Sequence, residues 1–160
     1  MANGTSTSHA RLPIAEILDS PDRREAYLVE MATWARDRQG GPAPELGPVT
    51  ITGNTEPTPT RQHVTRALLD ETNWLAERLT SASVAGRAAA HLLVFTGLGQ
   101  ETTVLSEVHT KLRQRLLRRG IVIDEFHQTS VSTNAHNRSY PSGLPPWPCY
   151  AMRAFIPHHD

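Results

Sequence analysis

Cysteine and lysine are almost missing from this sequence, which has a single residue of each, Cys149 and Lys111. One cysteine cannot form an internal disulfide and excludes a cysteine-rich zinc site, so nothing indicates an oxidising compartment. The N-terminal residues lack the charged and then apolar pattern of a signal peptide, and no apolar run approaches the roughly 20 residues of a membrane helix. We therefore expect a cytoplasmic protein with no membrane partner.

The sequence also lacks a net charge, because 16 acidic residues balance 16 basic ones. This balance argues against nucleic acid as a partner, since proteins that bind it usually carry a basic excess. What the sequence does have is 38% hydrophobic residues in a chain of 160, enough to bury roughly two-thirds of the unfolded surface. We expect a flexible tail over residues 1–12, which are small and polar, and a single domain over residues 13–160.

Apolar periodicity predicts a mixture of helices and strands. Helical spacing predicts one helix from Ser20-Pro21 to Gly40, another from Thr60 and a third over residues 101–119, while residues 72–80 permit either helix or strand. Compact apolar runs predict strands at residues 49–52, 91–98, 121–126 and 149–156. The strand, helix and strand between residues 91 and 126 form a crossover unit. We predict an α+β domain with a small, mainly antiparallel sheet and helices packed on it.

The strand at residues 121–126 delivers ionisable groups into a long polar loop. Alternate side chains of a strand share a face, so Glu125 and His127 should emerge together, whereas Asp124 should point the other way. A carboxylate beside an imidazole is suited to acid/base chemistry. We predict His127, Glu125 and Asp124 as catalytic residues. Two alternatives stay open: the pair can supply ligands to a metal, with a third from the histidines at positions 136, 158 or 159, or it can be the polar end of a strand.

The segment after this strand has the length and composition of a functional loop. Its arginine at position 138 can clamp a carboxylate or phosphate. Arg153, in the next strand, should lie partly buried on the face opposite Met152 and should need an anion, either Asp124, Glu125 or a substrate. The predicted substrate-binding residues are Arg153, Arg138, His136, Asn137, Tyr140 and Trp147.

The remaining histidines and the cysteine carry weaker signals. His63, near a helix start, and His91, at a strand start, have no evident partner in the sequence. His109 lies beside the apolar stripe of its helix, where a partnered surface or core histidine is the expected outcome. Cys149 opens a strand and is expected to be a small packing residue, because no helix N-terminus is at hand to lower the pKa of its thiol.

The C-terminal seventy residues resemble a known family. The segments "IVIDEFHQTS", "HNRSYPSGLPPWP" and "CYAMRAFIP" are similar to "GEFHP", "HNP.FRPLRSPVP" and "AIRHMV" of an uncharacterised actinobacterial domain family, a domain of unknown function. Gln128 stands where the family pattern has a proline. The resemblance implies a setting in specialised metabolism, such as antibiotic biosynthesis, and it implies no particular reaction.

Together these observations predict a small-molecule enzyme of specialised metabolism whose acid/base chemistry, or metal- or haem-assisted chemistry, is centred on His127. The alternative is a non-catalytic accessory protein that binds a small ligand or a partner. A homodimer is compatible with both hypotheses. The sequence identifies no cofactor.

Overall fold

The computed structural model describes residues 11–38, 49–81, 90–99, 101–127 and 145–154. Their helices and strands follow one another as β1 (Leu12–Pro13), α1 (Ile14–Asp19), a 3₁₀ turn (Pro21–Arg23), α2 (Ala26–Arg38), β2 (Val49–Asn54), α3 (Arg61–Ser81), β3 (Ala90–Phe95), α5 (Thr103–Arg118), β4 (Ile121–Phe126) and β5 (Cys149–Ala154). Residues 1–10, most of the predicted tail, lie outside this part of the chain. Leu12, at the end of that predicted tail, pairs with Ile51 of β2.

The strands form one sheet in the order β1-β2-β3-β5-β4. Only β2 and β3 are parallel neighbours, and the other pairs are antiparallel. The predicted α+β fold with a mainly antiparallel sheet is confirmed. The predicted strand-helix-strand unit, β3-α5-β4, is also present, but β5 lies between its two strands. A second such unit, β2-α3-β3, joins neighbouring strands.

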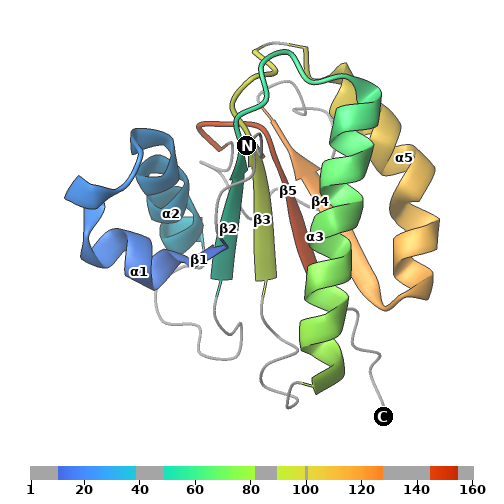
Figure 1. Cartoon of the computed structure of the whole chain (residues 1–160), viewed down its shortest axis with the longest axis horizontal. Coiled ribbons are helices and arrows are strands. Elements are labelled where there is room, and N and C mark those ends of the chain that lie inside the picture. The colour runs from blue at the N-terminus through green and yellow to red at the C-terminus, as the bar shows by residue number, and fades with distance from the viewer. Residues whose placement is uncertain (1–10, 39–48, 82–89, 100, 128–144, 155–160) are drawn as a thin grey trace, which may run out of the picture.

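Helices cover both faces of this sheet (Figure 1). On one face α3 and α5 pack on alternate strand residues, and the buried members of this core include Leu68, Leu105, Leu116, Phe95 and Tyr150. On the other face α1 and α2 pack on the strand residues in between, and this core includes Ile17, Met31, Ile51, Val94 and Cys149. Cys149 is fully buried, as expected of a packing residue.

The helix predicted from Ser20 begins later than expected. Pro21–Arg23 forms only a single 3₁₀ turn, and Arg24 is extended, with φ −118° and ψ 155°, before α2 starts at Ala26. Proline fixes a φ that suits the first turn of a helix, but it does not oblige the chain to continue as one. The short elements β1 and α1 were not predicted, because they are too short to show a period.

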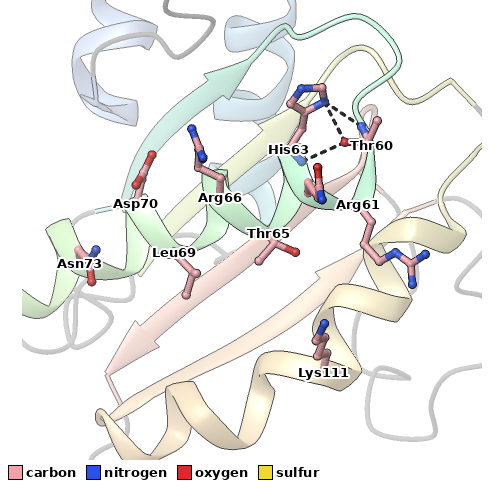
Figure 2. Close-up of a pocket in the computed structure, with 10 residues that line it drawn as sticks. Thr60, Arg61, His63, Thr65, Arg66, Leu69, Asp70, Asn73 and Lys111 are labelled. Carbon is pink, nitrogen blue, oxygen red and sulfur yellow. Dashed lines mark hydrogen bonds between the residues drawn. The ribbon is translucent and has the colours of Figure 1, made fainter.

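The helix predicted from Thr60 is confirmed, and residues 72–80 are helical. The hydroxyl of Thr60 accepts the backbone N–H of His63 at 3.2 Å, and Nδ1 of His63 accepts the backbone N–H of Thr60 at 3.0 Å (Figure 2). This reciprocal pair is a capping box in which an imidazole takes the place of the usual Glu or Gln side chain. Further along α3, Leu75 is buried against the sheet, so the helical period continues past the ambiguous segment.

The carboxyl ends of β2, β3 and β4 meet at one edge of the sheet, where α3 and α5 begin (Figure 1). Backbone contacts tie the loops there together: Thr96 N donates to Asn54 O at 3.1 Å, and the Oδ1 of Asn54 accepts Glu56 N at 3.0 Å. A Cβ at Gly97 would lie 2.0 Å from Glu56 O, so only glycine fits at this crossing. In open α/β sheets this edge is where ligands usually bind.

Candidate functional site

A carboxylate at the carboxyl edge binds two imidazoles and a hydroxyl. Oε1 of Glu125 lies 2.8 Å from Nδ1 of His109, and Oε2 lies 2.9 Å from Nε2 of His127. The hydroxyl of Ser106 donates to the same Oε2. We call Ser106, His109, Glu125 and His127 the Glu125 cluster. Its carboxylate is only 15% exposed, so the contacts form in partial shelter from water.

Local sequence explains why these side chains meet. Glu125 and His127 are two residues apart at the end of β4, so they share the face that α5 covers. Ser106 and His109 are three residues apart on α5 and therefore lie on one flank of that helix. The buried stripe of α5, which includes Leu105 and Leu112, fixes the helix against the sheet with this flank toward β4.

Both ring nitrogens of His109 lie close to hydrogen-bond acceptors. Its Nδ1 faces the Glu125 carboxylate and its Nε2 lies 3.1 Å from the carbonyl oxygen of Ile123. Both neighbours are acceptors only, so the doubly protonated ring satisfies both contacts and either neutral tautomer satisfies one. In His127 the Nε2 is engaged with Glu125, so any proton exchange with a ligand would have to use Nδ1.

Burial and hydrogen bonding act on Glu125 in opposite directions. Burial raises the pKa of this carboxyl group, but hydrogen bonds from His109, Ser106 and His127, together with the charge of His109, outweigh it and lower the pKa from its usual value of 4.5 to about 2. Glu125 is therefore ionised across the physiological range and is a very weak base. Its role in the cluster is to orient and charge-balance the imidazoles.

The lowered pKa predicts how stability depends on pH. A carboxyl group with a depressed pKa stabilises the fold fully above its unfolded pKa, near 4.5, and loses that contribution as the pH falls toward about 2. The contribution of Glu125 is about 3 kcal/mol. Urea unfolding followed by circular dichroism between pH 7 and pH 3 should show this loss in the wild type and a flatter profile in Glu125→Gln. The pKa of Glu71, described below, is also lowered, and Glu71 contributes to the slope of both proteins, so equal slopes would contradict the assignment to Glu125.

A concavity of about 420 Å³ borders the cluster. It lies between the second half of α5 and strand β4, and the Glu125 cluster reaches it through His109. His127 does not line it and its side chain is only 5% exposed. The lining consists of His109, Arg113, Gln114, Leu117, Ile121, Val122, Ile123 and Asp124.

The structure separates the three residues predicted to be catalytic. Glu125 and His127 meet as the alternation of a strand predicts. Asp124 is exposed on the other side of β4, so it does not join them, although it lines the concavity beside His109. His109 was expected only to be a partnered surface or core histidine, and Ser106 was not predicted to belong to the site. Their spacing on one flank of a helix was visible, but that this flank faces β4 was not.

The predicted substrate-binding residues that the structure describes do not gather at the cluster. Arg153 lies on the face predicted for it, yet it is exposed, so the expected partial burial is wrong. It pairs across the sheet with Val122, and no ion pair among the described residues links it to Asp124 or Glu125. Arg153 stays exposed because the core formed with α1 and α2 includes the earlier residues of β5 on this face, Cys149 and Ala151, and does not extend to Arg153. The side chains of His136, Asn137, Arg138 and Tyr140 lie outside the described residues.

Trp147 is tied to helix α2. Its indole N–H donates to Oε1 of Glu30 at 2.7 Å, and its ring packs edge-on against Tyr27 at a centroid distance of 6.4 Å. Its half-buried ring anchors the start of β5 to the α2 side of the sheet. We therefore assign Trp147 a structural contact on the face opposite the Glu125 cluster.

A second imidazole-carboxylate network is buried between α3 and the amino ends of β2 and β3. Nε2 of His91 lies 2.7 Å from Oε1 of Glu71, and Nδ1 lies 2.6 Å from the hydroxyl of Thr50. Thr52 donates to Glu71 at 2.9 Å, and Arg11 binds both carboxylate oxygens, at 2.9 and 3.1 Å. We call these five residues the Glu71 cluster.

The Glu71 cluster pairs one buried anion with one cation and a neutral ring. Burial lowers the pKa of His91 and outweighs the opposing effect of Glu71, so the ring is neutral, with Nε2–H donating to Glu71 and Nδ1 accepting from Thr50. Burial raises the pKa of Glu71, but hydrogen bonds from His91, Arg11 and Thr52 outweigh burial. The pKa is therefore lowered from its usual value of 4.5, and the carboxylate is ionised. The ring of Trp74 covers His91 at a centroid distance of 4.7 Å.

No partner for His91 was evident in the sequence, although a signal for its burial was present. His91 alternates with Leu93 and Phe95 in a strand, and that placement puts its ring in the core, where a polar group must be hydrogen-bonded. Which residue would supply the carboxylate could not be known, because Glu71 belongs to a different element. His91, Thr50 and Glu71 are all buried, so this network has the character of a structural core.

A concavity of about 1210 Å³ lies along the outer side of α3 (Figure 2). Arg61, Arg66 and Asp70 line it from α3, and Lys111 lines it from the flank of α5 opposite Ser106 and His109. Arg61 is 3.9 Å from Glu107, which partly offsets its charge. The Glu125 cluster contributes nothing to this groove.

The described residues contain neither a cluster of metal-binding side chains nor a helix that could span a membrane. No group of three or more His, Cys, Asp or Glu side chains in that part of the chain is arranged to hold a metal ion. The predicted third ligands, at positions 136, 158 and 159, lie outside it. Among its helices, none combines the length and apolarity needed to cross a bilayer.

The fold and the site define a class of protein: an α+β domain in which a carboxylate at the edge of the sheet binds two imidazoles. The model of a family described as a domain of unknown function (DUF6875) matches residues 30–160, and the chain belongs to that family. The resemblance to an uncharacterised domain family is thereby confirmed. No match was found among curated proteins or among solved structures.

Proposed function

We propose that this protein is an enzyme that acts on a small molecule by general acid/base catalysis, with His127 as the proton-transferring residue. The observation that carries the proposal is the contact of one sheltered carboxylate, Glu125, with two imidazoles. A carboxylate that binds one ring nitrogen fixes the orientation of the ring and the tautomer that presents the other nitrogen. In His127 this other ring nitrogen is Nδ1.

The other members of the Glu125 cluster have supporting roles in this proposal. Ser106 and His109 hold the carboxylate from α5, so Glu125 cannot rotate away from His127 without breaking both contacts. The low pKa of Glu125, about 2, keeps it charged while His127 gains and loses a proton. We class Glu125, Ser106 and His109 as positioning residues.

The setting of the proposed reaction comes from the sequence. The family resemblance supports specialised metabolism, such as antibiotic biosynthesis, and we propose that the reaction takes place in the cytoplasm. A homodimer is compatible with the proposal. The composition supports a small-molecule substrate over nucleic acid.

The test is turnover with and without the orienting carboxylate. Purified protein would be incubated with a fractionated extract of bacterial metabolites, and consumption and product formation would be followed by mass spectrometry. We expect Glu125→Gln to convert the same compound about 10²-fold more slowly, because the amide cannot accept an N–H bond from both rings. Glu77→Gln, a matched change at an exposed position of α3, should convert it at the wild-type rate. Equal rates for wild type and Glu125→Gln would reject the proposal.

Binding without chemistry is the second candidate function. It is supported by the engagement of both ring nitrogens of His109, the member of the Glu125 cluster that lines the concavity. A binding protein would retain ligands from the same extract and return them unchanged. Ligand recovery after denaturation, without any new compound, would favour this function over catalysis.

A further inference from the structure

We propose that Tyr150 positions the Glu125 cluster, because its hydroxyl group fixes the turn of α5 that carries Ser106 and His109 against the end of β4. The inference rests on the proposed function, since it names a further positioning residue for that site. Tyr150 is fully buried and acts only through other residues, so it is a positioning residue and not a catalytic one.

Tyr150 lies directly opposite Glu125 in the sheet. The two residues are register partners of the antiparallel strands β4 and β5, and such partners direct their side chains to the same face. That face is the one that α5 covers, and the ring of Tyr150 packs there edge-on against Phe95 at a centroid distance of 6.0 Å. The core therefore holds the ring of Tyr150 beside the side chain of Glu125.

The hydroxyl group of Tyr150 reaches from the sheet to the backbone of α5. It donates to the carbonyl oxygen of Leu105 at 2.7 Å. Burial raises the pKa of this hydroxyl group and the charge of Glu125 raises it further, so the group keeps its proton and donates. A phenylalanine ring would fill the same space without a hydroxyl group that is costly to bury, so packing alone does not account for the hydroxyl group.

The bond to Leu105 falls on the turn of α5 that forms the Glu125 cluster. The carbonyl of each residue in an α-helix accepts the N–H of the residue four positions later, so the carbonyl of Leu105 also accepts the backbone N–H of His109. The helix does not need Tyr150 to satisfy this carbonyl, and the added bond fixes the distance between this turn and the sheet. Ser106 is the next residue, so a shift of the turn by about 1 Å would lengthen the contacts of both Ser106 and His109 with Glu125.

The test is Tyr150→Phe in the full chain, which removes the hydroxyl group and keeps the ring. The first readout is the NMR signals of the ring N–H protons of His109 and His127, which lie downfield when these protons are hydrogen-bonded to the carboxylate. We expect these signals to move upfield in Tyr150→Phe, because the contacts with Glu125 lengthen. Turnover should fall about tenfold, with the loss in kcat and not in KM, because the carboxylate would orient His127 less firmly.

Thr72→Val is the matched control for Tyr150→Phe. The hydroxyl group of Thr72 is also fully buried and also donates to a helix carbonyl, that of Leu68 in α3, at 2.7 Å. Both variants should lower the melting temperature by a similar few degrees, since each loses one buried hydrogen bond. Thr72→Val should nevertheless keep the imidazole signals and the turnover of the wild type.

Two results would overturn the inference: imidazole signals in Tyr150→Phe that match those of the wild type, or equal changes of these signals in Tyr150→Phe and Thr72→Val. The NMR readout requires no turnover, so the two proposals can fail separately. Unchanged imidazole signals in Tyr150→Phe, in a protein whose turnover depends on Glu125, reject this inference alone. An upfield shift in Tyr150→Phe, with no turnover in the wild type, rejects the proposed function alone.

Discussion

Replacing Glu71 with alanine is expected to lower the free energy of unfolding by about 3 kcal/mol, because it removes the acceptor of a buried hydrogen-bond network and the partner of a partly exposed arginine. The variant would remove the acceptor of three donors, which are the N–H of His91, the hydroxyl of Thr52 and the guanidinium of Arg11. His91 and Thr52 are fully buried, so water cannot replace the lost acceptor without opening the core.

The effect of Glu71→Ala can be measured by urea unfolding at pH 7 and by the melting temperature, which should fall by about 10 °C for a domain of this size. Asp70→Ala is the matched control, since the neighbouring carboxylate is exposed and its loss should change stability by less than about 0.5 kcal/mol. If Glu71→Ala and Asp70→Ala unfold at the same urea concentration, the Glu71 cluster does not hold the core together.

Replacing His127 with glutamine is expected to reduce turnover by about 10² to 10⁴-fold, the usual contribution of a general acid or base. The amide can keep a hydrogen bond to Glu125 but cannot exchange a proton near neutral pH. The loss should fall on kcat more than on KM, and the pH dependence of any residual activity should lose the step due to the imidazole. Stability should change by only about 1 kcal/mol, since the side chain's contact with Glu125 can be retained.

His63→Gln is the matched control for His127→Gln. His63 completes the capping box of α3, and glutamine is a natural residue at that position of the motif, so the helix should be unaffected. Wild-type turnover in His63→Gln with strong loss in His127→Gln would support the assigned role. Activity retained in His127→Gln, or lost only in step with stability, would show that His127 is structural.

Short-range patterns predicted the parts of the fold that depend on single elements. The stripe at Leu105, Leu112 and Leu116 predicted α5, and the alternation in "IVIDEF" predicted both strand β4 and the shared face of Glu125 and His127. These predictions succeed because the periods of helix and strand fix which side chains share a face before any packing occurs. The α+β class follows from the order of the elements in the same way.

Local sequence did not determine features that depend on where an element lies in the fold. Arg153 was assigned to the correct face, yet its exposure depends on how far the helices on that face extend over β5. Trp147 was predicted to bind substrate, but it contacts Glu30, which is 117 residues away in sequence. Neither the exposure of Arg153 nor the contact of Trp147 with Glu30 can be predicted from neighbouring residues in the sequence.

The sequence by itself determined the longer elements, their buried faces and the joint emergence of Glu125 and His127, because these follow from backbone geometry over a few residues. Only the tertiary structure decided which partners those groups would have. It set the flank of α5 with Ser106 and His109 against Glu125, and it enclosed His91 with Glu71 and Arg11. Such pairings depend on the packing of helices on a sheet, which brings together residues from separate elements, and the two imidazole-carboxylate clusters of the described residues form in that way.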